Sequence, residues 1–290
     1  MAETKVALVT GASRGAGAGI ARGFGELGYT VYVTGRTITP GDARGWDGTV
    51  LPGTVAETAA KVTELGGKGI PVMCDHGDDE QVAALFKQIE EEQGQLDVLV
   101  NNAAYIHHQL IEKKPFWEKE LDAAKILDVG LRSAYVASWH AAKMMVKQGS
   151  GVIAFGSSFG ASCYMHGPAY GAQKAGLDKF AHDMEHDLRE TGVMAVSIWL
   201  GPLVTERSLI AQKTNPEQYE GFIETAENPE FTAHILDAMD KAPNRAELSG
   251  QTLIGAEIAK ELGITDRGKE RPSYRDMLGT PPTKNPAAVY

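Results

Sequence analysis

The chain has 290 residues with 28 Lys and Arg against 38 Asp and Glu, so its formal net charge is −10. This acidic balance argues against binding to nucleic acid, because contact with a phosphate backbone requires clustered cations. Two cysteines, Cys74 and Cys163, are too few for a disulfide scaffold. The apolar run at residues 6–9 is too short for a secretory signal, and no run approaches the roughly 18 residues of a membrane span. We expect a cytoplasmic protein with neither nucleic-acid nor membrane partners.

Short apolar segments alternate with amphipathic ones, the pattern of a parallel sheet covered by helices on both faces. Strands are expected at residues 6–10, 30–34, 70–74, 96–101, 152–155, 193–200 and 252–254. Helices are expected at about residues 15–27, 55–65, 79–93, 119–148 and 170–190. The sequence predicts a doubly wound, Rossmann-like α/β fold of about seven strands, in the order 3-2-1-4-5-6-7.

Two segments interrupt this alternation. Residues 37–53 form a loop rich in Gly, Pro and Thr, and residues from about 205 to 244 are expected to be helical without a strand and to form a substrate loop. A polar segment with several prolines ends the chain. We expect one domain over residues 1–262, followed by a C-terminal extension over residues 263–290.

The turn after the first expected strand is rich in glycine. It reads TGASRGAG over residues 10–17 and continues directly into a helix. Glycines let the backbone approach a ligand, and a helix N-terminus offers free N–H groups to a pyrophosphate. The turn predicts a dinucleotide site, with a ligand-free loop as the alternative. A literal G-x-G-x-x-G at residues 23–28 lies late in a helix and is better explained by helix packing.

The choice of nicotinamide cofactor depends on charge at the end of the second strand. An acid there would bind the ribose hydroxyls of NAD, whereas this strand ends at Gly35-Arg36, and Arg14 lies in the glycine-rich turn. Guanidinium groups pair well with phosphate, so the pattern favours the 2′-phosphate of NADP over NAD. Two solvated arginines without a ligand are the alternative.

Tyr170 and Lys174 are four residues apart and therefore share one face of a helix. A nearby cation lowers the pKa of a phenol, which would suit Tyr170 to acid–base work. Ser157 and Ser158 follow the fifth strand, at the sheet edge where ligands of α/β folds bind. A serine there could hydrogen-bond a substrate carbonyl.

These features resemble the short-chain dehydrogenase/reductase family from about residue 4 to 206, with weaker similarity to about 262. Residues 101–104, Asn-Asn-Ala-Ala, are similar to the family's Asn-Asn-Ala-Gly stretch. The resemblance implies hydride transfer between nicotinamide and a carbonyl or alcohol carbon. Tyr170 would be the acid/base, and Lys174 would bind the nicotinamide ribose and lower the pKa of Tyr170. Ser157, thirteen residues before Tyr170 as is usual in the family, is preferred to Ser158 for orienting the carbonyl.

The resemblance also implies a set of cofactor-binding residues at the ends of the strands and on the catalytic helix. These are Gly11, Ser13, Arg14, Gly15, Ala16, Gly17, Arg36, Thr37, Asp75, His76, Asn102, Ala103, Tyr170, Lys174, Gly201, Val204 and Thr205.

The sequence departs from the family pattern in several places. Gly130 stands where the family usually has an asparagine that holds a proton-relay water, which leaves the proton route open. Leu200 replaces a usual proline, and Ala104 a usual glycine. The run Val129-Gly130-Leu131-Arg132 is most similar to the subgroup called dehydrogenase/reductase member 1-like, which shares the glycine. Members of that subgroup are regarded as NADPH-dependent reductases of steroid-like or xenobiotic carbonyls.

Other signals are weaker. Residues 182–186 match the zinc pattern H-x-x-E-H but are better explained as a polar helix face, so no metal is expected. Several loop residues could contact substrate, with simple loop or core positions as the alternative. These residues are His107, His108, Phe116, Trp117, Tyr164, Met165 and His166.

The sequence therefore predicts an NADPH-dependent reductase of a small ketone or aldehyde. The alternatives are an NAD(P)-dependent alcohol dehydrogenase working in the oxidative direction and a non-catalytic dinucleotide-binding sensor or scaffold. The family resemblance further implies a homodimer or homotetramer, packed through the helices at about residues 119–148 and 170–190.

Overall fold

The structure, a computed structural model, describes residues 4–45, 48–214, 216–217, 221–283, 285 and 287–290. The start of the chain, residues 46–47 of the expected loop and residues 215 and 218–220 of the expected helical segment lie outside the described residues.

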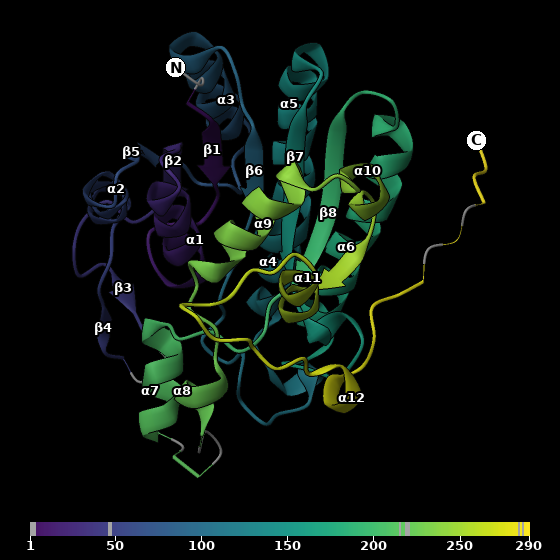
Figure 1. Cartoon of the computed structure of the whole chain (residues 1–290). Coiled ribbons are helices and arrows are strands. Elements are labelled where there is room, and N and C mark those ends of the chain that lie inside the picture. Colours follow the sequence, from purple (N-terminus) through teal and green to yellow (C-terminus); the bar gives the residue numbers. More distant parts are fainter. Residues whose placement is uncertain (1–3, 46–47, 215, 218–220, 284, 286) are drawn as a thin grey trace.

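A seven-stranded parallel sheet forms the centre of the molecule, with strand order β5-β2-β1-β6-β7-β8-β9 (Figure 1). Counted along the chain within this sheet, the order is the predicted 3-2-1-4-5-6-7. The strands are β1 (Val6–Val9), β2 (Thr30–Gly35), β5 (Lys68–Met73), β6 (Val98–Asn101), β7 (Gly151–Ser157), β8 (Val193–Trp199) and β9 (Thr252–Ile254). The Rossmann-like fold predicted from the sequence is confirmed.

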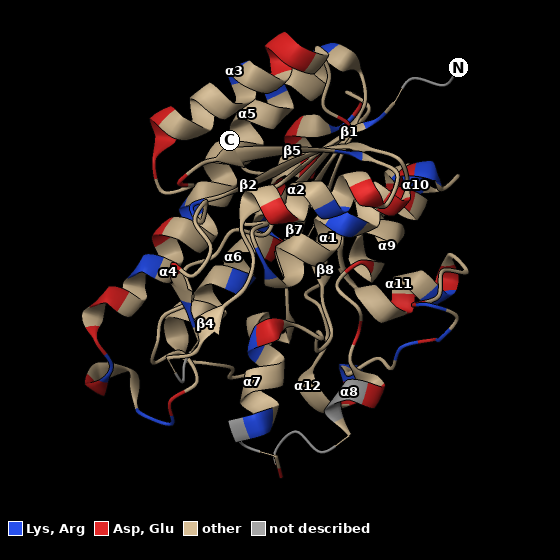
Figure 2. Cartoon of the chain, turned by 90° about the vertical axis from the view of Figure 1, so that its left-hand side faces the viewer, with Lys and Arg blue, Asp and Glu red and all other residues tan. Residues whose placement is uncertain are grey.

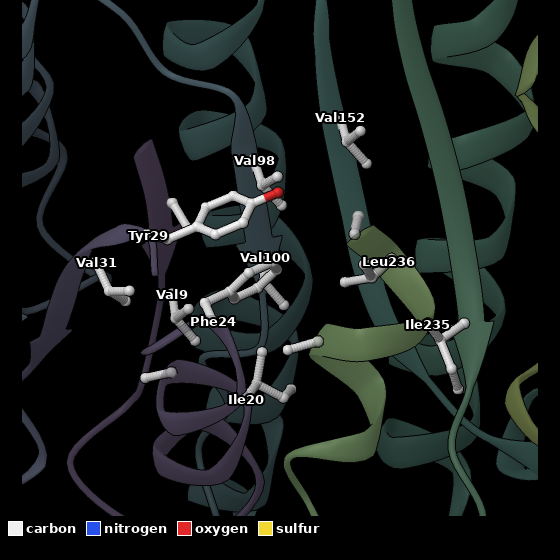
Figure 3. Close-up of a cluster of buried hydrophobic side chains, with 14 of the residues drawn as sticks. Val9, Ile20, Phe24, Tyr29, Val31, Val98, Val100, Val152, Ile235 and Leu236 are labelled. Atoms are coloured by element: carbon white, nitrogen blue, oxygen red, sulfur yellow. The ribbon is translucent and has the colours of Figure 1, made fainter. Parts of the chain in front are cut away.

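Two layers of helices cover the sheet. One face packs against α1 (Gly15–Glu26), α2 (Val55–Glu64) and α9 (Phe231–Lys241), and the other against α3 (Asp79–Gln93), α5 (Ser133–Gln148) and α6 (Pro168–Leu188). In the first layer, side chains of α1 and α9 meet valines of the central strands, as Figure 3 shows. Charged residues of both signs are dispersed over the outer helices rather than gathered by sign (Figure 2).

Local sequence signals set the helix ends. Gly28, Gly66 and Gly149 follow helices with φ of 79°, 107° and 76°, the left-handed region that glycine adopts without strain. Asp78 caps α3 by accepting the N–H groups of Glu80 and Gln81 at 3.0 and 3.2 Å.

Two expected segments differ in detail. The loop at residues 37–53 contains a short antiparallel pair, β3 (Ala43–Arg44) and β4 (Val50–Leu51). The single helix expected over residues 119–148 is wrong, because tertiary hydrogen bonds hold its first part in another conformation: Glu120 N–H donates to Gln109 Oε1 (2.9 Å) and Lys119 Nζ to Leu110 O (3.1 Å). That part consists of short turns at Phe116–Glu118 and Leu121–Ala124, the one-turn helix α4 (Lys125–Leu127) and a π-helical turn (Asp128–Arg132).

The segment after β8 is helical, as expected. It forms α7 (Glu206–Thr214), α8 (Phe222–Thr225) and α9, and is followed by α10 (Arg245–Leu248), β9 and α11 (Gly255–Glu261). Within the described residues, no helix combines the length and the apolar character needed to cross a membrane.

The C-terminal segment is fixed to the body through a buried carboxylate. Asp266, 2% exposed, accepts hydrogen bonds from Asn228 N–H (2.8 Å) and from the guanidinium Nε of Arg271 (2.7 Å). Farther on, Arg275 in α12 (Arg275–Leu278) pairs with Glu257 of α11. The last residue, Tyr290, lies against α6, with its hydroxyl 2.8 Å from His186 Nε2.

We predict that Asp266→Ala destabilises the fold by about 3–5 kcal/mol, because it leaves the buried Arg271 guanidinium without its carboxylate. The free energy of unfolding in urea measures this loss. Glu270→Ala, which removes an exposed partner of Lys260, is the control and should leave that free energy nearly unchanged. Equal stabilities of the two variants would contradict the anchoring role of Asp266.

Candidate active site

The glycine-rich turn and the end of β6 are joined by direct hydrogen bonds. Thr10 Oγ1 accepts the N–H groups of Asn102 and Ala103, each at 2.9 Å, and Asn102 Nδ2 donates to the carbonyl of Gly11 at 3.1 Å. A Cβ at Gly11 would lie 2.7 Å from Ala103 Cα, and one at Gly17 would lie 2.4 Å from Asn102 Nδ2. Only glycine fits at these positions. The glycine-rich motif therefore lets the turn after β1 pack directly against the residues that follow β6.

The N-terminus of α1 already accepts an anionic group. Gly15 N–H donates to Glu206 Oε2, the first residue of α7, at 3.0 Å. The carboxylate at this N–H shows that the start of α1 offers a hydrogen-bond donor to an acidic group. Sequence reasoning missed Glu206, because no local signal connects two residues that lie 191 positions apart.

The arginines expected near the cofactor ribose lie beside the segment at residues 37–53. Arg14 donates through Nε to Pro52 O (3.2 Å) and through Nη2 to Gly53 O (2.6 Å). Arg36 is exposed, with Nη1 3.9 Å from Asp75 Oδ2. Of the two arginines, therefore, Arg14 before α1 is partly engaged by backbone carbonyls, and Arg36 after β2 is exposed.

His76 takes an interior position instead of facing a ligand. Its ring is buried, with Nε2 2.8 Å from Thr34 Oγ1, and burial lowers its pKa to about 4. The neighbouring Asp75 accepts the N–H of Gly77 at 2.9 Å. The His76 ring is therefore held in the interior and is not exposed to a ligand.

The two serines after β7 point in different directions. Ser158 Oγ lies 3.0 Å from the hydroxyl of Tyr170 on α6, within hydrogen-bonding distance. Ser157 is 2% exposed and donates its hydroxyl proton to the carbonyl of Lys174 at 3.2 Å. The geometry thus disagrees with the preference for Ser157 that rested on spacing. Successive residues of an extended segment face opposite sides, so a choice between neighbours needs the structure.

Burial is the main cause of the shifted pKa values of Tyr170 and Lys174. It raises the pKa of Tyr170, and the hydrogen bond from Ser158 only partly opposes this. Burial also lowers the pKa of Lys174 to about 8, against the charge of Asp178. Lys174 Nζ donates to Gly156 O at 2.8 Å and lies 5.5 Å from the centre of the Tyr170 ring. The net shift of the Tyr170 pKa is therefore upward in this structure, opposite to the expected lowering, because burial is its largest cause.

The loop after β8 is supported from below by a buried acid. Val204 N–H donates to Glu227 O at 3.0 Å, and a Cβ at Gly201 would lie 2.6 Å from Glu227 Oε1. Thr205 N–H donates to Ser208 Oγ at 2.8 Å, which turns the chain into α7. Burial raises the pKa of Glu227 to about 7. No sequence pattern had singled out Glu227.

A cavity of about 160 Å³ opens beside Tyr170. Most of its lining is apolar, and its polar side chains include His107, Lys119 and His166. Of the aromatic residues expected near substrate, Phe116 and Tyr164 line it. Trp117 is 72% exposed, and Met165 packs instead against the cluster around Phe159. The apolar residues of the lining are Leu110, Phe116, Leu121, Ala123, Ala124, Ile126, Leu127, Tyr164, Pro168 and Ala169.

Two groups of residues that contain histidine could be considered as metal ligands. They are His107 and His108 with Glu120, and the H-x-x-E-H residues at 182–186. Donor atoms of His107, His108 and Glu120 lie within 4.8 Å of one another. However, His107 Nδ1 accepts the N–H of Gln109, so Nε2 carries the ring proton, donates it to Asp122 and has no lone pair for a cation. The residues of the H-x-x-E-H pattern diverge: His182 bonds Asp183, Glu185 bonds Arg189, and His186 bonds Tyr290.

Comparison with known proteins places the chain in a family. The sequence model of the family described as short chain dehydrogenase matches residues 5–216. Dehydrogenase/reductase SDR family member 1 of Mus musculus is 38% identical over 274 residues, covering 90% of this chain and 83% of its own length. Tropinone reductase-like 2 of Erythroxylum coca is 30% identical over 259 residues, covering 89% and 82% of the two chains.

A solved structure of a short chain dehydrogenase from Mycobacterium thermoresistibile shares the fold. It is 22% identical, with a TM-score of 0.73, covering 90% of this chain and 88% of its own. The family match and the relatives at this level of identity lead to one conclusion. The chain belongs to the short-chain dehydrogenase/reductase family, whose oxidoreductases act on CH–OH and carbonyl groups with a nicotinamide dinucleotide.

Proposed function

We propose that this enzyme uses NADPH to reduce the carbonyl of an apolar ketone or aldehyde, such as a steroid-like or xenobiotic compound. The observation that carries the proposal is the pair of hydroxyls, Ser158 and Tyr170, 3.0 Å apart where Tyr170 lines an apolar cavity. A non-catalytic dinucleotide-binding protein has no need of such a pair beside a buried lysine. Alcohol oxidation remains the alternative direction, and the raised pKa of Tyr170 favours reduction, because the phenol keeps the proton that a reduced carbonyl oxygen takes up.

The chemistry divides among three side chains. Ser158 donates a hydrogen bond to the carbonyl oxygen as negative charge develops on it, and Tyr170 gives that oxygen a proton. The nicotinamide supplies the hydride that reduces the carbonyl carbon. Lys174, charged below pH about 8, stabilises the phenolate left at Tyr170 by electrostatic attraction.

Three features support NADPH rather than NADH. The end of β2 carries no acid for the ribose hydroxyls, and Arg36, the residue that follows the strand, is exposed. Arg14 stands beside the same segment. The N–H groups at the start of α1 would hold the pyrophosphate, and the loop holding Gly201, Val204 and Thr205 would face the nicotinamide end, as in the family.

The outer face of α5 supports a homodimer or homotetramer. Tyr135, Trp139 and Val146 of this helix are 51%, 49% and 44% exposed, and Tyr135 packs against Phe180 of α6. Large apolar side chains gathered on neighbouring helices are typical of a protein interface. Free thiols at Cys74 and Cys163 support a reducing, cytoplasmic compartment.

We predict that Tyr170→Phe lowers turnover of a responsive carbonyl at least about 100-fold, because the proton donor is lost. NADPH consumption against a panel of ketones, quinones, steroids and aldehydes measures this, with NADPH binding as the check on folding. Ser158→Ala should lower kcat/KM about 100-fold through loss of the hydrogen bond to the developing oxyanion. Ser157→Ala is the matched control and should retain most of kcat/KM; the reverse ranking would restore Ser157 as the catalytic serine.

We predict that NADPH binds at least about tenfold more tightly than NADH, since one charge-assisted phosphate contact contributes this much. Dissociation constants from fluorescence titration test the ratio. Arg36→Ala should remove most of the difference by weakening NADPH binding alone. Lys68→Ala, on the edge strand β5, is the charge-matched control. Equal constants for the two cofactors in the native protein would overturn the preference.

We predict that the mass in solution corresponds to two or four chains, and that Trp139→Glu shifts it toward one. A charge placed in an apolar interface is desolvated without a partner, which disfavours association. Light scattering coupled to size exclusion gives the mass. Lys87→Glu, on the opposite end of the same helix layer in α3, introduces the same charge and should leave the mass unchanged. A native mass of one chain would contradict the proposed homodimer or homotetramer.

A further inference from the structure

A second cavity adjoins the one beside Tyr170. Its volume is about 390 Å³, within the range of small-molecule sites. We call the cavity beside Tyr170 the inner cavity and this one the outer cavity. The residues that line both of them are Leu110, Lys114, Lys119, Tyr164 and His166. A substrate longer than the inner cavity would therefore extend into the outer one.

The charged side chains that line the outer cavity are mainly cationic. They are Glu112, Lys113, Lys114 and Lys119, in a chain whose net charge is −10. Lys114 Nζ lies 2.7 Å from Glu112 Oε2, so these two charges neutralise one another. Burial lowers the pKa of His166, and the charge of Lys119 acts in the same direction, so this ring is neutral near neutral pH. Lys113 and Lys119 are left as the cations of the outer cavity.

Lys119 holds its charge in a fixed place. Its side chain is half-buried, and Nζ donates to Leu110 O at 3.1 Å, which keeps the ammonium in the lining of both cavities. The adjacent Glu120 pairs with His108 at 3.2 Å, and among the described residues none supplies a carboxylate that pairs with Lys119. An ammonium has three N–H donors, of which Leu110 takes one. A half-buried charge without a counter-ion favours an anionic ligand.

His166 connects this cation to the reacting hydroxyl. Its φ is 59°, in the left-handed region that few residues other than glycine adopt without strain. In this conformation its ring lies edge-on to the ring of Tyr170, with the centroids 5.0 Å apart, and it lines both cavities. The outer cavity is thus continuous with the site of the chemistry and is not a separate hollow of the surface.

We propose that the outer cavity binds an acidic group of the substrate, and that the substrate is a carbonyl compound with a carboxylate at the far end of an apolar chain. The carbonyl oxygen lies at Ser158 and Tyr170, and the apolar chain fills the inner cavity. The carboxylate accepts hydrogen bonds from Lys119, and the exposed Lys113 adds attraction. The inference rests on the proposed reductase function and narrows its substrates to oxo acids.

A homologous series of methyl ketones tests the subsite. The series is CH3–CO–(CH2)n–COO−, with n from about 2 to 8, and each acid is compared with its primary amide, which has nearly the same size and no charge. At the best chain length, we expect kcat/KM with NADPH to be at least about tenfold higher for the acid than for the amide, mainly through KM. A charge-assisted hydrogen bond to a remote group contributes this much, in the ground state and the transition state alike. Higher salt concentration should reduce the ratio.

Variants of the two lysines assign the effect to the outer cavity. Lys119→Met keeps the length of the side chain and removes its charge, so it should lower kcat/KM about tenfold for the acid and less than about twofold for the amide. Lys119→Arg should retain most of the preference for the acid, and Lys113→Gln should lower it about twofold, because Lys113 is exposed. Lys147→Met, at an exposed site on α5, removes the same charge and should leave the ratio unchanged.

A binding measurement separates the subsite from the reaction. Nonanoate, a saturated acid without a ketone, should bind the NADPH-loaded protein in calorimetry more tightly than nonanamide does, and Lys119→Met should remove the difference. Ketone turnover that is lost in Tyr170→Phe, together with equal kcat/KM for every acid and its amide, would overturn the inference and leave the proposed function standing.

The opposite failure is also recognisable. A protein that turns over no carbonyl compound would remove the proposed function, whereas nonanoate binding that depends on Lys119 would still support an anionic subsite. Equal binding of nonanoate and nonanamide by that protein would overturn the subsite as well.

Discussion

The buried carboxylate of Asp178 is the interaction on which the active site depends. It lies on α6, one helical turn beyond Lys174, and accepts hydrogen bonds from Ser197 Oγ (2.6 Å) and Trp199 Nε1 (2.9 Å) of β8. A buried charge is costly without partners, so these donors hold α6 against β8. Ser157 at the end of β7 donates to the Lys174 carbonyl of the same helix at 3.2 Å, and the next residue, Ser158, is the serine beside Tyr170.

Burial also determines the order in which Lys174 and Tyr170 lose their protons as pH rises. Ordinary pKa values are 10.0 for tyrosine and 10.5 for lysine. Here burial raises the first and lowers the second to about 8, so Lys174 loses its proton before Tyr170 does as pH rises. Asp178 opposes the loss by favouring the ammonium. Near neutral pH the site thus holds a charged lysine and a protonated phenol, the pair of states that a proton donor for a reduced carbonyl requires.

Some features of the fold and the candidate site could be predicted from the sequence, and others could not. The strand order, the glycine-rich turn and the Tyr170–Lys174 pair follow from local patterns, because period, turn chemistry and helical spacing act over a few residues. Glu206 has no such signal, because its partner Gly15 lies on a distant element. The choice between Ser157 and Ser158 stays a prediction for a related reason: spacing along the chain does not say which of two neighbours turns toward Tyr170, and in the structure Ser158 does so.

The glycine-rich turn at residues 10–17 and the segment that begins at α7 are connected by a hydrogen bond. Gly15 has one N–H, and Glu206 at the start of α7 accepts it, so a phosphate bound there and the carboxylate exclude one another. Past α7 and α8 the same segment reaches Glu227, which supports the loop after β8, and then Asn228, which Asp266 holds. The segment that begins at Glu206 is therefore joined at one end to the glycine-rich turn and at the other to the loop after β8 and to the C-terminal segment.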